Sequence, residues 1–302
     1  MNNKIYDQFV AALRSNGLSK NEAVLVVAEY IEADKVGQHS HGLSAFPNLL
    51  KRLKERGGPV KVIKNKGSTI FLDGNKELGQ LAAEKATKLA TEKAKRFGIG
   101  LVGLKNILPF MRPGTYAKKL ADSKLVGIVM IDGGSAMMTH PDSPESVIGT
   151  NPIAFSIPTG RGSLVVDMAT SKSAWSKVRR ALKNGTKLPP GTYKDKTGKF
   201  TTDPKNAYSV VPFGDYKGFA LGMLVEILCN GLLGMTMGKH KKTANRVAAS
   251  RGAIFIAIDP ARFGSIKNFK NATTKFLKEI EKSKRNPGIK KIRIPGKSSL
   301  KK

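Results

Sequence analysis

The alternation of short apolar runs with segments of helical periodicity constrains this chain more than any other sequence feature. Residues 79–97 have apolar side chains at helical spacing, and residues 217–233 form a longer apolar segment. Because strands and helices alternate without a regular β-α-β rhythm, we expect an α/β fold of layered helices around a mixed sheet, with non-Rossmann topology. Strands are expected at 99–104, 126–131, 154–157, 164–167 and 253–258.

Helical spacing dominates the beginning of the chain. Ser19 and Glu22 have the form of a capping box, which predicts the start of a helix. Around Gly67 we expect one or two strands. Helices are expected at 5–13, 21–33, 44–56 and 266–284. We therefore expect three parts: a helical N-terminal part at 1–72, an α/β core at 73–260, and a C-terminal helix with a basic tail at 261–302.

The apolar segments also bear on where the protein works. The first residues lack the apolar stretch of a signal peptide, and the apolar segment at 218–237 contains Glu226 and Asn230. Cys229 is the single cysteine, so an intramolecular disulfide is impossible. These features predict a cytoplasmic protein without a membrane segment.

The charge balance is unusual. Lys plus Arg number 53 against 22 Asp plus Glu, which gives a net charge of +31. Such a basic balance is typical of nucleic-acid-binding proteins. The basic residues are nevertheless spread along the chain, with enrichment at 239–242 and 267–302. A surface that attracts anionic metabolites in general explains the charge equally directly, so both interpretations stay open.

One motif is misleading. Residues 98–103 spell G-x-G-x-x-G, the dinucleotide-binding fingerprint, which requires a strand before the glycines and a helix after them. Here a predicted helix ends at Phe97 and a predicted strand follows. We therefore expect Gly98 to terminate that helix.

Residues 37–42 place a hydroxyl group and two imidazoles between glycines, just before a helix. Such a segment can hold a substrate carboxylate, and it can equally be a capping loop with structural histidines. The run at 167–171 leaves a strand, with Thr170 or Ser171 as the expected N-cap of a helix. Lys217 stands in the first turn of another helix, where a cation is unfavourable unless it serves an anion, so it is a candidate phosphate or carboxylate contact.

Taken in order, these segments resemble the malate/L-lactate dehydrogenase family with a non-Rossmann cofactor fold. That family includes ureidoglycolate and sulfolactate dehydrogenases, diketogulonate reductase and piperideine-carboxylate reductase. The matching motifs are G-x-x-S-H-G at 37–42, G-Q at 79–80, G-T-N-P-I-A-F at 149–155, D-M-A-T-S at 167–171, T-D-P at 202–204, K-G-F-A-L at 217–221, A-I-D-P at 257–260 and I-P-G at 294–296.

The resemblance implies a homodimeric enzyme that uses NADH or NADPH to interconvert a 2-oxo acid, or a cyclic imine acid, with its reduced form. It places Ser40 and His41 beside the substrate carboxylate and makes Asp195 a candidate for orienting the catalytic group. The residues expected to face the cofactor are Gly149, Thr150, Asn151, Pro152, Asp167, Thr170, Ser171, Lys217 and Gly218.

The chain departs from the family pattern at two chemical positions. Pro109 stands where the family has the histidine expected to donate a proton to the carbonyl, and such general acids contribute about 10²–10⁴-fold to the rate. His41, Tyr116 and Lys217 are candidates for a displaced acid. Ala45 stands where the family has an arginine that clamps the carboxylate, and Arg112 is the candidate replacement.

Three interpretations follow. The chain is a working reductase with an altered site, an impaired relative that keeps the fold and the cofactor, or a basic protein whose partner is nucleic acid or another polyanion. The four histidines are split between His39 and His41, His140, and His240, and no cysteine cluster accompanies them. We therefore expect no metal site.

Overall fold

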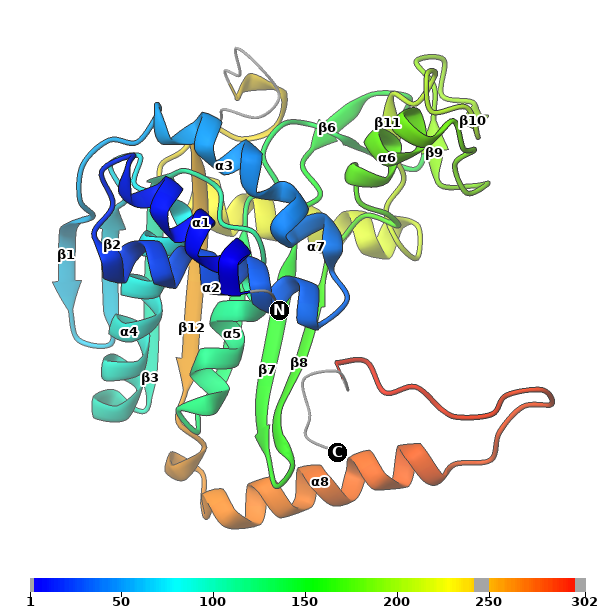
Figure 1. The fold of residues 1–302 in the computed structure, drawn as a ribbon. Helices are drawn as coiled ribbons and strands as arrows, with labels where there is room; N and C mark the ends of the chain where they lie inside the picture. Colours follow the sequence, from blue (N-terminus) through cyan, green and yellow to red (C-terminus); the bar gives the residue numbers. More distant parts are fainter. Residues whose placement is uncertain (1–2, 242–249, 297–302) are drawn as a thin grey trace.

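The computed structural model describes residues 3–241 and 250–296, and its centre is a mixed sheet (Figure 1). β2 and β3 pair in parallel, and the other neighbouring pairs are antiparallel. The last strand in sequence, β12, lies between β3 and β4. This order confirms the mixed, non-Rossmann α/β fold. In spatial order the strands are β1 (Lys61–Lys66), β2 (Thr69–Asp73), β3 (Ile99–Ile107), β12 (Arg251–Ile258), β4 (Val126–Ile131), β7 (Ile153–Thr159) and β8 (Gly162–Met168).

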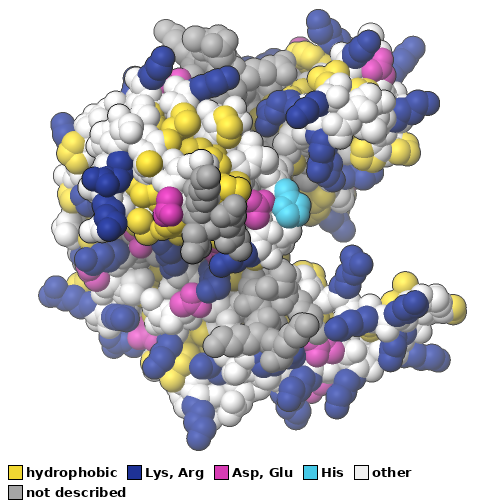
Figure 2. Space-filling view, in the orientation of Figure 1, with side chains coloured by type: hydrophobic (Ala, Val, Ile, Leu, Met, Phe, Trp, Pro, Cys, Tyr) yellow, Lys and Arg dark blue, Asp and Glu magenta, His cyan; other side chains and the backbone are white. Residues whose placement is uncertain are grey.

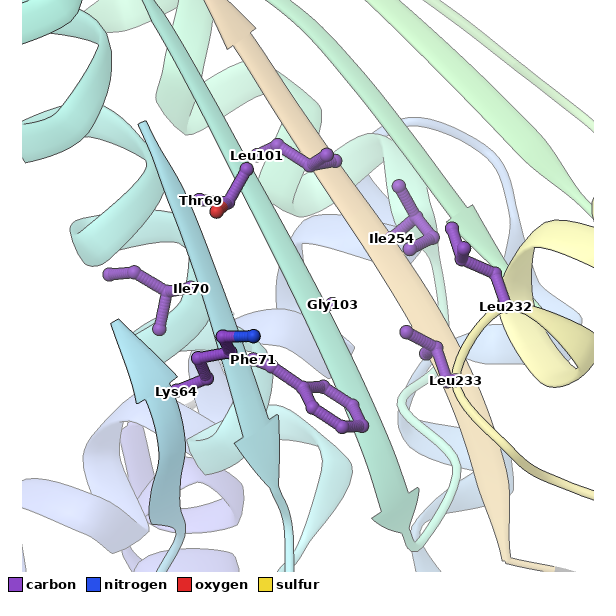
Figure 3. Close-up of a pocket in the computed structure, with 9 residues that line it drawn as sticks. All are labelled: Lys64, Thr69, Ile70, Phe71, Leu101, Gly103, Leu232, Leu233 and Ile254. Carbon is purple, nitrogen blue, oxygen red and sulfur yellow. The ribbon is translucent and has the colours of Figure 1, made fainter. Parts of the chain in front are cut away.

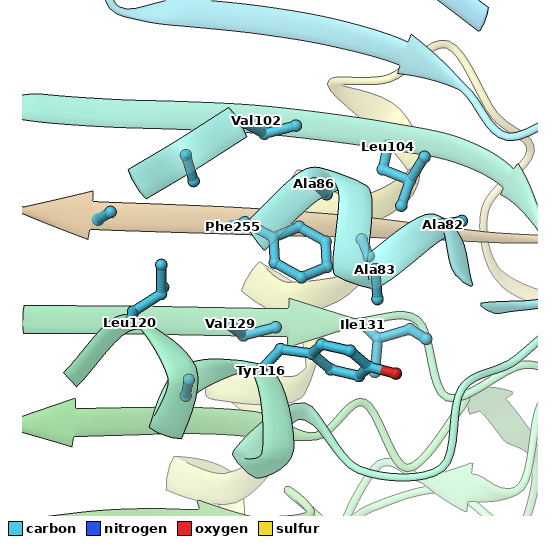
Figure 4. Close-up of a cluster of buried hydrophobic side chains, with 14 of the residues drawn as sticks. Ala82, Ala83, Ala86, Val102, Leu104, Tyr116, Leu120, Val129, Ile131 and Phe255 are labelled. Atoms are coloured by element: carbon cyan, nitrogen blue, oxygen red, sulfur yellow. The ribbon is translucent and has the colours of Figure 1, made fainter. Parts of the chain in front are cut away.

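Helices α4 (Gly79–Phe97) and α5 (Pro113–Asp122) cover one face of this sheet. Figure 4 shows alanines of α4, including Ala83 and Ala86, lying against Phe255 of β12, with Tyr116 of α5 beside them. Small side chains let the helix approach the strands closely. At Gly98 the backbone is left-handed with φ 87°, so this residue ends α4 as expected.

The opposite face is covered in part by α7 (Tyr216–Glu226), which continues as one π-helical turn, η3 (Ile227–Gly231). Its inner side packs on the sheet through Val225 and Cys229. Beyond η3, Leu233 points toward Phe71 of β2 across Gly103, at an apolar pocket that the two residues help to line (Figure 3). The expected helix at 217–233 therefore exists, although its α-helical part ends earlier.

Three N-terminal helices form a layer with its own apolar cluster, around Val26, Tyr30 and Phe46. Ser19 and Glu22 form the predicted capping box, with both reciprocal hydrogen bonds present. The helices are α1 (Asn3–Arg14), α2 (Lys20–Lys35) and α3 (Phe46–Leu53), and the short 3-10 turns η1 (His39–His41) and η2 (Leu43–Ala45) join the last two.

A smaller lobe lies at the upper right of Figure 1. It contains helix α6 and a second sheet of very short strands. The prediction that Thr170 or Ser171 caps the start of a helix was wrong. Ser171 forms a β-bridge with Pro212, and α6 begins only after Trp175. The elements are α6 (Ser176–Asn184), β10 (Phe200–Thr201), β9 (Tyr193–Lys194), β11 (Ser209–Val210), β5 (Met138–Thr139) and β6 (Ser146–Ile148).

The last helix, α8 (Ile266–Lys282), lies along the foot of the sheet, and the segment after it loops outward and returns, so that Ile294 packs on Leu164 of β8 (Figure 1). Leu277 packs on Leu164 of β8, and Thr274 accepts a 2.9 Å hydrogen bond from the Gly160 amide. The remaining short turns are η4 (Gly238–His240) and η5 (Pro260–Arg262). Within the described ranges, every helix is too short or too polar to cross a bilayer.

Candidate active site

The segment that carries Ser40 and His41 is organised by Asp34, near the end of α2. One carboxylate oxygen of Asp34 lies 2.9 Å from Nδ1 of His39, and the other accepts a 2.9 Å hydrogen bond from the Leu43 amide. A Cβ atom at Gly42 would lie 1.9 Å from the Asp34 carboxylate. The glycine of S-H-G is therefore required for this contact, and Asp34 is a positioning residue that the motif alone did not identify.

His41 lies next to the hydroxyl of Ser40, with 3.0 Å between Oγ and Nδ1. Burial, together with the positive charges of Arg112 and Arg179, lowers the pKa of His41 to about 4. The imidazole is therefore neutral at pH 7. In this state it can donate one hydrogen bond, but it does not carry the extra proton expected of a strong general acid.

Glu29, on α2, holds the loop that contains the altered catalytic position. Its Oε1 accepts hydrogen bonds from the amides of Met111 (3.1 Å) and Arg112 (3.2 Å), and its Oε2 accepts one from the Tyr116 hydroxyl (3.1 Å). Burial raises the pKa of Glu29 to about 7, while these hydrogen bonds oppose the rise. We did not predict Glu29, although a glutamate three residues after Val26 and four before Ala33 stands on the apolar face of its helix.

Arg112 and Asp167 form a buried pair behind this loop, with 3.4 Å between Nε and Oδ2. The Gly114 amide donates a 3.1 Å hydrogen bond to the same carboxylate oxygen. Burial raises the pKa of Asp167, and Arg112 opposes that shift. Nε of Arg112 is engaged by Asp167, whereas its Nη1 is buried without a hydrogen-bond partner in the described part of the chain. Arg112 thus has an unused donor, as a residue that binds a substrate anion requires.

Two of the predicted catalytic residues are corrected by their surroundings. Tyr116 is 1% exposed between Phe110 and Phe255, and burial raises its pKa well above the usual value. Its hydroxyl already donates to Glu29, so it cannot serve as the displaced acid. Asp195 lies on the exposed β9–β10 hairpin, where its Oδ1 accepts three local hydrogen bonds from Thr197 and Lys199. These hydrogen bonds show that Asp195 stabilises the turn. They do not support its predicted role in orienting the catalytic group.

Pro109 is buried where the loop crosses the beginning of α4. A Cβ at Gly79 would lie 2.2 Å from the Leu108 carbonyl oxygen and 2.6 Å from the carbonyl carbon of Pro109. The G-Q pair of the sequence therefore allows the loop to pass this close to the helix.

The G-T-N-P loop is held by Asn151, which has φ 33° and is fully buried. Its side chain accepts from the Gly133 amide (2.8 Å) and donates to the Gly222 carbonyl (2.8 Å) and to Glu226 (2.9 Å). The hydroxyl of Thr170 donates to the Thr150 carbonyl at 3.1 Å. The side chains of Asn151 and Thr170 are therefore engaged in holding the fold.

An ionic network continues from that loop. Lys241 lies 2.6 Å from both Asp132 Oδ1 and Glu226 Oε1, and its side chain is 6% exposed. Glu226 also accepts from the side chains of Asn151 and Asn230. This network joins the segment after η3 to β4 and to the start of β7.

At the beginning of α7 the residues differ in exposure. Lys217 is exposed, and its Nζ lies 6.0 Å from the Tyr216 ring centroid. Gly218 is buried, and a Cβ there would meet the Phe213 carbonyl oxygen at 2.1 Å. Asp215 precedes the helix but makes no side-chain cap hydrogen bond. The first turn thus combines an exposed lysine with amides that no side chain caps.

Comparison with known proteins agrees with this fold and these motifs. Residues 2–302 match the malate/L-lactate dehydrogenase family. The chain is 35% identical over 295 residues to malate/(S)-sulfolactate dehydrogenase of Methanothermus fervidus, covering 95% of this chain and 85% of the relative. It is 34% identical over 265 residues to (2R)-3-sulfolactate dehydrogenase (NADP(+)) of Chromohalobacter salexigens, covering 84% and 79% of the two chains.

The solved structure of sulfolactate dehydrogenase from Methanocaldococcus jannaschii superimposes with a TM-score of 0.86 at 32% identity. The superposition covers 97% of this chain and 87% of that one. Its fold, like the present one, is a mixed α/β arrangement. The chain therefore belongs to the malate/L-lactate dehydrogenase family of oxidoreductases.

Proposed function

We propose that the protein is an NADH- or NADPH-dependent reductase that interconverts a short 2-oxo acid and the corresponding 2-hydroxy acid. The observation that carries this proposal is Arg112, whose Nη1 is buried without a hydrogen-bond partner among the described residues and whose charge acts on His41. An arginine and a carboxylate form a strong, directional pair. Arg112 then performs, from a different loop, the clamping role for which Ala45 has no functional group.

Each residue has a defined part in this proposal. Arg112 binds and orients the substrate carboxylate, Ser40 fixes the orientation of His41, and Asp34 and Glu29 hold the two loops in place. With Ser40 donating to Nδ1, neutral His41 carries its hydrogen on Nε2 and can donate a hydrogen bond to the substrate oxygen. When bound, the nicotinamide cofactor supplies or accepts the hydride. Because Pro109 has no titratable group, proton transfer relies on His41 or on solvent.

The residues at the first turn of α7 fit a phosphate-bearing cofactor. Lys217 is exposed beside uncapped amides, and the positive end of a helix attracts phosphate groups. Main-chain atoms of Gly149 and Thr150 are further candidates for holding the cofactor. Asn151 and Thr170 would act indirectly, by keeping those main-chain atoms in position.

We also propose a homodimer in the cytoplasm. One face of the sheet has a partly exposed row of apolar side chains, in which Leu101, Ile256, Ile128 and Phe155 are successive cross-strand partners. Phe155 is 36% exposed, and Leu224 and Leu232 nearby on α7 and beyond η3 are 51% and 63% exposed. A continuous apolar surface of this kind is typical of an interface between subunits.

The basic surface favours small anions over a dedicated nucleic-acid track. Figure 2 shows Lys and Arg side chains distributed over the visible face, including the small lobe and α8, rather than gathered in one groove. The first experiment is a fluorescence titration of the folded protein with NADPH and with NADH at moderate salt. Saturable micromolar binding, followed by turnover of 2-oxo acids, is the expected result.

The matched variants for that experiment are Arg112→Gln and Arg180→Gln. Loss of Arg112 is expected to raise the KM for a 2-oxo acid by about 10- to 100-fold, because a charge-assisted hydrogen bond contributes about 1.5–3 kcal/mol. Exposed Arg180 serves as the control and should leave KM unchanged. Failure of the folded protein to bind either cofactor would refute the reductase proposal and favour a polyanion-binding protein.

A further inference from the structure

We infer that the small lobe is an electrostatic guide for a phosphate-bearing cofactor. Its exposed Lys and Arg side chains speed the arrival of the cofactor at the first turn of α7 without holding it once it is bound. The inference rests on the proposed reductase function and adds an interaction surface to it. The ligand class is a nucleotide with several phosphate charges, so NADPH is guided more strongly than NADH.

Positive charge is concentrated in the part of the lobe formed by residues 172–205. This segment contains ten Lys and Arg residues and two Asp residues, an excess of 8 charges over 34 residues, compared with 31 over the 302 residues of the chain. The excess per residue is thus more than double that of the whole chain. The basic residues are Lys172, Lys177, Arg179, Arg180, Lys183, Lys187, Lys194, Lys196, Lys199 and Lys205.

These charges are not neutralised within the lobe. Nine of the ten basic residues are exposed, and only Lys194 is buried. None of the ten forms an ion pair with another described residue. Asp195 and Asp203 accept hydrogen bonds from backbone amides of their own turns. The excess charge therefore acts on the surrounding solvent and on ligands.

A contribution to folding does not explain this charge. Like charges one helical turn apart destabilise a helix, and Arg179 and Lys183 on α6 are such a pair. The neighbouring β5–β6 loop adds two acids, Asp142 and Glu145, and Glu145 is already paired with Lys239. The charge of the lobe lowers the stability of the folded chain, so attraction of an anionic ligand is the better explanation.

The lobe lies directly beside the start of α7. Phe219 of α7 packs on the apolar cluster of the lobe, with 4.8 Å between its ring centroid and that of His140. In Figure 1, α7 runs beneath the lobe, and Figure 2 shows a hollow below the lobe with Lys and Arg side chains at its edges. A cofactor that approaches Lys217 from this hollow passes the charged surface of the lobe.

Helix α8 is also basic but lies at the opposite end of the sheet. It contacts the turn between β7 and β8 through Thr274 and Gly160, whereas the chain after β8 enters the lobe at Ser171. The seven residues of β8 span about 23 Å at about 3.3 Å per residue. The Debye length at 0.1 M salt is about 10 Å, so charges on α8 act only weakly at the start of α7.

The strength of guidance depends on the charge of the ligand, because the Coulomb energy is proportional to that charge. The extra phosphate of NADPH adds about −1.5 to −2 charges at pH 7, and a singly charged 2-oxo acid is attracted least. Surfaces of one sign raise association rates by about 10- to 1000-fold. Because the field is the sum of many charges, one neutral substitution such as Arg180→Gln changes it little.

The test measures association and dissociation rate constants of NADPH and NADH by stopped-flow fluorescence, using the full chain at about 100 and 500 mM NaCl. Two triple variants are compared, and both lower the net charge by the same amount. The lobe variant has Lys177→Glu, Lys183→Glu and Lys187→Glu, and the control variant has Lys267→Glu, Lys275→Glu and Lys278→Glu on α8. All six lysines are exposed.

In the lobe variant, the association rate constant of NADPH should fall about 10-fold at 100 mM NaCl and less than about 2-fold at 500 mM. Its dissociation rate constant should change less than about 2-fold, and the decrease in association should be smaller for NADH. The control variant should match the wild type. Unfolding temperatures establish that both variants are folded.

Three results would overturn the guide while leaving the reductase function intact. Equal slowing of association in both variants would assign the effect to net charge alone. Faster dissociation with unchanged association in the lobe variant would make its lysines direct cofactor contacts. Identical rate constants in all three proteins would show that the lobe does not act on the cofactor. Failure of the folded wild type to bind either cofactor refutes the reductase function and the guide together.

A single-stranded RNA oligonucleotide tests the other class of anion that a basic surface can bind. Micromolar RNA binding at about 150 mM NaCl that is lost only in the lobe variant, with unchanged NADPH rate constants, would assign this surface to nucleic acid and overturn the guide. Equally weak RNA binding by all three proteins, with slower NADPH association in the lobe variant, supports the guide.

Discussion

Glu29 ties the N-terminal helices to the loop at residues 108–112, and its ionisation is linked to stability. Its pKa is raised from 4.5 to about 7 by burial in the folded protein. A carboxyl group with a raised folded pKa binds its proton more tightly in the folded state than in the unfolded one. The free energy of unfolding therefore falls as pH rises from about 4.5 to 7, and the loss is complete above 7.

Replacing Glu29 with glutamine is expected to stabilise the protein at neutral and alkaline pH. The amide oxygen can still accept from the Met111 and Arg112 amides, since both bond to Oε1, while the buried charge is removed. The gain should approach about 3 kcal/mol at pH 8 and vanish near pH 4.5. Urea unfolding of both proteins at several pH values measures it. A difference that does not vary with pH would contradict this account.

Single residues of the site could be predicted where a family motif contained them, or where a charged residue stood on the loop that departs from the family pattern. The Ser40 hydroxyl lies 3.0 Å from Nδ1 of His41, and the charge of Arg112 acts on the same imidazole, while their part in substrate binding stays a prediction. Asp34 and Glu29 act through backbone amides of loops distant in sequence, and such contacts leave no spacing to detect. Tyr116 kept the family register but is buried in the core, because register does not determine the depth of a side chain.

At the scale of elements, Lys241 connects three segments through two buried carboxylates. Its replacement by methionine would leave Asp132 and Glu226 without their shared cation, and uncompensated buried charge costs about 3–5 kcal/mol. We expect a correspondingly lower free energy of unfolding for Lys241→Met. The measurement is chemical unfolding followed by circular dichroism.

Lys239 provides the matched control for that variant. It forms an ion pair with Glu145, but both side chains are more than half exposed. Exposed ion pairs contribute little because solvent screens them. Lys239→Met should therefore unfold like the wild type, and equal losses in the two variants would contradict the role assigned to the buried network.

Elements were predictable in proportion to their length and to the clarity of their ends. Helix α4 matches its predicted bounds because an amphipathic run of 19 residues ends at a glycine that can adopt positive φ. The strands of the small lobe have two or three residues each, too few to show a period of two. The predicted start of the helix was wrong because the Thr170 hydroxyl donates to the Thr150 carbonyl and the Ser171 hydroxyl to the Ser173 carbonyl, instead of capping a helix.

At the scale of the whole molecule, the net charge of +31 opposes compactness. Repulsion between like charges destabilises a folded chain. Added salt weakens this repulsion because the Debye length falls to about 10 Å at 0.1 M. The unfolding temperature should therefore rise between about 20 and 300 mM NaCl. Differential scanning calorimetry measures this change, and a constant or falling temperature would show that attractive ion pairs outweigh the repulsion.

The apolar row on the sheet gives a test of assembly. Phe155→Lys places a charge in the proposed interface and should convert particles of twice the 32.6 kDa chain mass into monomers. Phe200→Lys is the control, since Phe200 is 60% exposed on the small lobe. Sedimentation analysis distinguishes the two states. A wild-type monomer at micromolar concentration, or dimers that persist in Phe155→Lys, would exclude this surface as the interface.

The saturated side chain of Asn151 has a consequence for how the history of such proteins is inferred. Its amide is used entirely to join the G-T-N-P loop to α7 and to the turn after β4, so selection for correct folding alone is enough to preserve it. A lineage that had lost the reaction would still retain this motif. Genome surveys that count this motif as evidence of an active enzyme would therefore include inactive descendants.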